Sequence, residues 1–99
     1  MEHGLFRIVS VSVTGPHALW LRFDDGIERT IELAPVLYGA IYGPLRDPAE
    51  FARVVLDSEV GTVTWPCGAD FDPATLHDWP DHEAAWLEKA RGWRMAAVG

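Results

Sequence analysis

The chain has few of the groups on which several protein classes depend. Its 99 residues include one cysteine, Cys67, which excludes an internal disulfide framework and fits a reducing compartment. No stretch approaches the roughly 20 apolar residues of a membrane-spanning helix, and no segment has the basic and apolar regions of a signal peptide. We therefore expect a cytoplasmic protein with no membrane partner.

Positive charge is also scarce. Eight basic residues, of which only Lys89 is a lysine, stand against fifteen aspartates and glutamates, and the formal net charge at pH 7 is −7. Because such a field repels phosphate backbones, we expect no direct nucleic-acid partner. The charge keeps a small protein soluble and mildly favours basic partners.

Motifs that carry a reaction mechanism are missing as well. The sequence has no glycine-rich phosphate loop and no Gly-x-Ser-x-Gly elbow, so neither nucleotide binding nor serine hydrolysis is indicated. Cys67 lies near Asp70 and Asp72 in the sequence, and neighbouring negative charges disfavour a reactive thiolate. These absences favour a protein that is not an enzyme and that uses no cofactor.

The chain is rich in apolar and aromatic residues. Hydrophobic residues make up 48% of the sequence, which is typical of a globular domain. Five tryptophans exceed the need of so small a core, which indicates that some lie at its edge or in a subunit contact. We expect a single α+β domain over residues 1–78, and a helical extension over residues 79–99 that packs on it or on a partner.

Apolar and polar residues alternate in a pattern that predicts a three-stranded antiparallel meander between Leu5 and Leu33. Val9–Val13 has a period of two, and Asp25-Gly26 is a strong hairpin signal between two such runs. The returning strand is expected to turn Ile27 and Ile31 toward the core. Two more short strands are predicted at 54–57 and 61–65.

Helix signals follow the meander. Asp47-Pro48 and Asp72-Pro73 each place a capping carboxylate before a proline suited to the first helical position. Asp81–Met95 has the spacing of an amphipathic helix, with Trp86, Ala90, Trp93 and, beside them, Leu87 on one face. That face is either a partner or dimer helix or the cover of the sheet's apolar side.

Three motifs occur in an order that resembles a small bacterial family. They are Phe-x-Asp-Gly at 23–26, Leu-Arg-Asp-Pro-x-x-Phe at 45–51 and Trp-Pro-x-Gly-x-Asp-x-x-Pro at 65–73. Together they are similar to the domain-of-unknown-function family 2442, over about residues 8–76. The resemblance implies an α+β fold with an antiparallel sheet, no established activity, and a regulatory or antitoxin-like module that meets a small partner protein. Cys67 stands where that family usually has asparagine.

The 65–73 loop combines turn formers with functional groups, so it is the predicted binding site. Arg46 is expected nearby, where it either anchors a loop carboxylate or receives an anionic ligand. The predicted interface residues are Trp86 and Trp93. The binding-loop candidates are Trp65, Pro66, Gly68, Asp70, Asp72 and Arg46.

A metal site is a weaker interpretation. His77, Asp78 and His82 carry ligand groups, but histidines five apart with a proline between them do not share a helical face. A third ligand has to come from Asp70 or Asp72. We therefore expect a non-enzymatic interaction or regulatory module that forms a homo-oligomer and meets a small protein partner. Small-ligand or metal binding in the 65–82 segment is the alternative.

Overall fold

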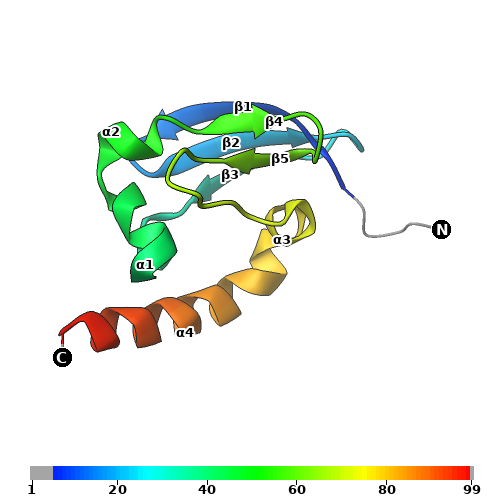
Figure 1. The fold of residues 1–99 in the computed structure, drawn as a ribbon. Helices are drawn as coiled ribbons and strands as arrows, with labels where there is room; N and C mark the ends of the chain where they lie inside the picture. Colours follow the sequence, from blue (N-terminus) through cyan, green and yellow to red (C-terminus); the bar gives the residue numbers. More distant parts are fainter. Residues whose placement is uncertain (1–5, 99) are drawn as a thin grey trace.

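The computed structural model describes the backbone of residues 6–98 and the side chains as far as Met95. A three-stranded sheet and a two-stranded hairpin lie together (Figure 1). The helices α1 (Gly39–Tyr42), α3 (Pro73–His77) and α4 (Trp79–Val98) lie on one side of them, and α2 (Pro48–Phe51) lies at one end of the strands. The predicted α+β fold is confirmed. Leu5, the predicted start of the first strand, lies outside the described residues.

The meander consists of β1 (Ile8–Gly15), β2 (Ala18–Phe23) and β3 (Glu28–Glu32), antiparallel in that order. Gly26 has a φ of 90°, which an L side chain rarely adopts, and so permits the tight turn between β2 and β3. The prediction that Ile27 faces the core is wrong. Its side chain is 42% exposed because β3 begins one residue later and Ile27 belongs to the turn.

The second sheet is the predicted pair of short strands, β4 (Val55–Asp57) and β5 (Thr62–Thr64). It runs beside β1, and the Ile8 N–H donates a hydrogen bond to the Gly61 carbonyl at 2.8 Å. This link ties the hairpin to the beginning of the meander.

Short helices connect the two sheets and lead to the C-terminal helix. The Asp47 side chain accepts a hydrogen bond from the Ala49 N–H at 3.0 Å and so caps the helix that follows it. Asp72 precedes a helix in the same way, but its side chain makes no capping bond, so that part of the prediction is wrong. The short helices are η1 (Ala34–Val36), α1 (Gly39–Tyr42), η2 (Gly43–Arg46), α2 (Pro48–Phe51) and α3 (Pro73–His77).

The last helix, α4 (Trp79–Val98), begins two residues before the predicted start. Pro80 is tolerated there because the first turn of a helix does not use its backbone N–H groups. The helix contacts η1, α1 and α3 and extends along the side of the domain away from the main sheet (Figure 1). None of the helices in residues 6–98 has the length and apolar character needed to span a membrane.

The core lies between the main sheet and the helices. The sheet contributes the inward side chains of β2 and β3, and the loops and helices contribute large apolar and aromatic residues. Its largest fully buried side chains are Phe23, Phe51, Leu19, Leu21, Leu33, Leu37, Leu45, Leu76, Val36 and Val63.

Candidate functional site

The predicted binding loop is anchored by its first residue. Trp65 is 3% exposed, and its indole Nε1–H donates to the Phe51 carbonyl at 2.8 Å. The chain then turns tightly, because the Gly68 N–H donates to the Trp65 carbonyl and the Trp65 N–H to the Ala69 carbonyl, both at 2.9 Å. The exposed tip consists of Pro66, Cys67 and Gly68. Trp65 is therefore a structural anchor, whereas the tip is open to a partner.

The two loop carboxylates are exposed. Asp70 contributes its backbone carbonyl, which accepts a hydrogen bond from the Tyr42 hydroxyl at 2.8 Å and ties the loop to α1. Burial raises the pKa of Tyr42, and the charge of Asp70 adds to that effect. The guanidinium of Arg46 lies 4.4 Å from the ring centroid of Tyr38. Among the described residues it forms no ion pair with either loop carboxylate.

Trp86 and Trp93, the predicted interface residues, are half-buried against their own domain. Their ring centroids lie 5.5 and 6.0 Å from that of Tyr42. Gly39 permits this close docking: its φ is 90°, and a Cβ atom there would lie 3.1 Å from the Trp93 ring. The placement of Leu87 on the same face is wrong, because Leu87 is 39% exposed whereas Ala90 is 2% exposed. Leu87 lies at the rim of the contact between α4 and the domain, and we call the exposed residues Glu83, Leu87 and Arg91 the outward stripe of α4.

A cavity of about 270 Å³ opens between η1 and α4, and we name it the arginine pocket. The Arg94 guanidinium lies 5.8 Å from the Tyr38 ring centroid, and Arg91 pairs with Glu88 at 2.8 Å. The lining residues are Pro35, Tyr38, Leu87, Ala90, Arg91 and Arg94.

A more apolar cavity of about 220 Å³ lies on the α1 side of Tyr38. Ile41, which is 56% exposed, forms part of its rim, and the Ile41 carbonyl lies 3.9 Å from the thiol of Cys67 at the loop tip. The loop tip therefore contacts α1. The lining residues are Tyr38, Gly39, Ala40, Ile41, Tyr42 and Trp93.

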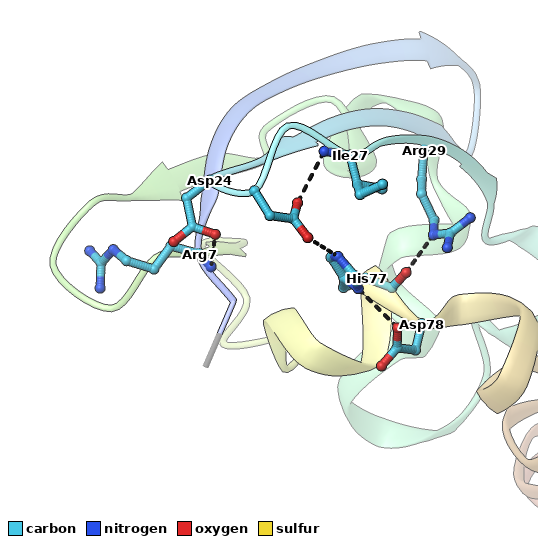
Figure 2. A network of polar contacts seen from close by, with 7 residues as sticks. Arg7, Asp24, Ile27, Arg29, His77 and Asp78 are labelled. Carbon is cyan, nitrogen blue, oxygen red and sulfur yellow. Dashed lines mark hydrogen bonds and ion pairs between the residues drawn. The ribbon is translucent and has the colours of Figure 1, made fainter. Parts of the chain in front are cut away.

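A polar network joins the β2–β3 turn to α3. The His77 imidazole places Nε2 2.6 Å from Asp25 Oδ2 and Nδ1 2.9 Å from Asp78 Oδ1, and Arg29 Nε donates to the His77 carbonyl. Figure 2 shows His77 between Asp78 on one side and the hairpin turn at Ile27 on the other. The ring also stacks on Phe6, with centroids 3.6 Å apart.

The protonation of this network follows from its partners. Burial alone lowers the pKa of His77, but the hydrogen bonds and negative charges of Asp78 and Asp25 outweigh it, so its pKa lies above the usual value. The pKa of Asp25 is lowered, first by the hydrogen bond from the Ile27 N–H and then, against the opposing effect of burial, by His77. The two shifts favour an ion pair between Asp25 and protonated His77.

The weaker metal interpretation gains no support from this arrangement. His77 directs its two ring nitrogens to different carboxylates, and His82 lies exposed on α4. Within residues 6–98, no three histidine, cysteine, aspartate or glutamate side chains gather in a way that could hold a metal ion.

Sequence reasoning missed two groups of residues. It assigned Asp25 to a turn and did not connect it to His77, 52 positions away. It also left out Tyr38 and Arg94 of the arginine pocket. The spacing of Leu87, Arg91 and Arg94 was the available signal, since residues four and three apart lie on one helical face.

The model of a family described as "Protein of unknown function (DUF2442)" matches residues 8–82. The matched segment ends in the first turn of α4, so most of that helix lies beyond it. No curated protein and no solved structure gives a match.

Proposed function

The chain belongs to the DUF2442 family, and we propose that this member is a non-enzymatic regulatory module that acts through protein–protein contacts, as a homodimer formed by α4. The observation that carries the proposal is the outward stripe of α4. One stripe of α4 packs against its own domain. Leu87 stays exposed, between the oppositely charged residues Glu83 and Arg91.

The inward and outward stripes of α4 are neighbours that differ in exposure. Trp79 and Ala90 are buried against the domain, and Trp86 is partly buried there. Glu83, Leu87 and Arg91 follow at intervals of four, which places them on one face, and all three are exposed. A second helix is therefore able to pack along this face without disturbing the domain.

Charge along α4 favours a copy of itself in the antiparallel direction. Asp81 and Glu83 lie in the first half of the helix, whereas Arg91 and Arg94 lie in the second. A two-fold axis near Leu87 brings the acidic half of one copy to the basic half of the other. Two copies that each carry a net charge of −7 repel one another, but opposite charges attract where the two helices meet.

The polar network around His77 supports a role without catalysis. Both ring nitrogens are engaged by carboxylates, and the ring stacks on Phe6 and meets Phe23 edge-on. These contacts hold the hairpin on α3, which is a structural task.

The regulatory part of the proposal concerns a small protein partner, as in an antitoxin-like module. The surface that fits it combines the exposed loop tip at Cys67 with Ile41, since these two residues are in contact and Ile41 lines a different cavity from Leu87 and Arg91. A homodimer built on α4 leaves both copies of this surface open.

Leu87→Asp tests the proposal. We expect wild-type protein to have twice the 11.0 kDa mass of one chain, and the variant to be monomeric at the same concentration. The substitution places two carboxylates against each other at the axis, and like charges in a contact cost several kcal/mol (about 100-fold or more in affinity). Light scattering after size exclusion measures the mass. Val60→Asp, at another exposed apolar residue (58%), is the control and should stay dimeric. A monomeric wild type refutes the proposal.

A further inference from the structure

The arginine pocket is a basic site in an acidic protein. Of the eight basic residues of the chain, Arg91 and Arg94 line the pocket together with Tyr38, and Arg46 lies over the Tyr38 ring but outside the lining. Within the described residues, Arg91 pairs with Glu88, whereas Arg46 and Arg94 pair with no carboxylate. Positive charges held close together on an aromatic wall are stabilised by an anion.

The walls of the pocket select the kind of anion. Ala90 forms a buried floor, and Pro35 and Leu87 add apolar sides. A free phosphate satisfies the guanidinium groups but leaves this apolar lining unused. A carboxylate at the end of a hydrocarbon stem contacts both, because the stem packs on the lining while the head group meets the arginines. A cavity of about 270 Å³ has room for one such side chain.

The α4 pairing supplies that side chain. Glu83 lies four residues before Leu87, and Arg91 lies four residues after it. When Leu87 lies on the two-fold axis of an antiparallel pair, Glu83 of one copy therefore lies opposite Arg91 of the other. Arg94 is one turn farther along the same face. Glu83 itself is exposed, and no bond to it occurs within the described residues.

We infer that the arginine pocket of one copy binds the Glu83 carboxylate of a second copy, between Arg91 and Arg94, and that this contact sets the register of the homodimer. The inference rests on the proposed function. It assigns a ligand class to the pocket, namely a carboxylate on an aliphatic stem. It also names the source of that carboxylate, which is a second copy of the same chain.

Charge reversal tests the pairing. We expect Arg94→Glu and Glu83→Arg each to weaken the homodimer at least tenfold, because each places like charges together in the pocket. The chain that carries both changes restores opposite charges across the contact and should dimerise within about threefold of wild type. Dissociation constants come from sedimentation of the full chain over a range of concentrations, and circular dichroism verifies that each variant is folded.

Two matched controls separate pairing from net charge. Lys89→Glu makes the same charge change as Arg94→Glu at a residue that lies over the Trp86 ring and outside the pocket lining. Glu59→Arg repeats the other change in the exposed β4–β5 loop. Both should dimerise like wild type. This inference is overturned if the single charge reversals leave the dissociation constant of the homodimer unchanged, or if the combined variant dimerises no more tightly than the single variants. Either result leaves the proposed homodimer intact. A monomeric wild type overturns both.

Discussion

Trp65→Ala is expected to remove about 4–6 kcal/mol from the free energy of unfolding. The indole is 3% exposed and packs against Phe51 and Phe71, with ring centroids 5.6 and 6.1 Å apart. Truncating a buried tryptophan costs about 3–5 kcal/mol, and the Phe51 carbonyl, left without its donor, adds about 1 kcal/mol or more. Since small domains are stable by only about 5–15 kcal/mol, the variant should lose a large part of its total stability.

Urea unfolding followed by tryptophan fluorescence and circular dichroism measures this loss. Trp65→Phe is the matched control: it keeps an aromatic ring beside Phe51 and Phe71 but loses the indole N–H, so we expect a cost of about 1–3 kcal/mol. If Trp65→Ala is no less stable than Trp65→Phe, Trp65 does not anchor the loop.

His77→Gln is expected to destabilise the protein in a pH-dependent way, by about 1.5–3 kcal/mol near pH 5.5 and by less at pH 9. Because the pKa of His77 is higher in the folded than in the unfolded chain, protonation stabilises the fold. This contribution is fully present below the unfolded pKa, about 6.5, and is lost as the pH rises through the folded pKa. Asp25 behaves oppositely, since its lowered pKa gives a contribution that disappears as the pH falls below about 3.8.

The measurement is the difference in unfolding free energy between wild type and His77→Gln at pH 5.5, 7 and 9. We expect the difference to narrow steadily with pH. His82→Gln, at an exposed position on α4, is the control and should show no such trend. A difference that stays constant from pH 5.5 to 9 means that protonated His77 does not pair with Asp25 and Asp78.

The predictable parts of the fold were those encoded locally. Alternation at Val9–Val13, the Asp25-Gly26 turn and the Asp47-Pro48 cap each depend on residues close in sequence, and the structure contains the corresponding strand, turn and helix start. Asp72-Pro73 has the same pattern but lacks the capping bond, which shows that the pattern predicts a helix start better than it predicts a hydrogen bond.

The candidate site was predicted less well because it depends on distant contacts. Arg46 was expected beside the loop carboxylates, but its guanidinium lies over the Tyr38 ring instead. Periodicity placed Trp86 and Trp93 on one face of a helix, yet it did not show that this face covers the protein's own domain. The exposure of each side of α4 depends on its contacts with the rest of the domain, which helical periodicity does not encode.

The most direct test of the homodimer is a disulfide across its axis. Cys67→Ser removes the one native thiol, and Leu87→Cys then introduces a single cysteine on the outward stripe of α4. A disulfide forms only where two Cα atoms approach within about 7 Å, which holds at the two-fold axis. We predict rapid oxidation to a species of twice 11.0 kDa, whereas a single cysteine introduced by Lys89→Cys in the same background stays monomeric under denaturing conditions. No cross-link at position 87, or equal cross-linking at position 89, contradicts pairing through this face.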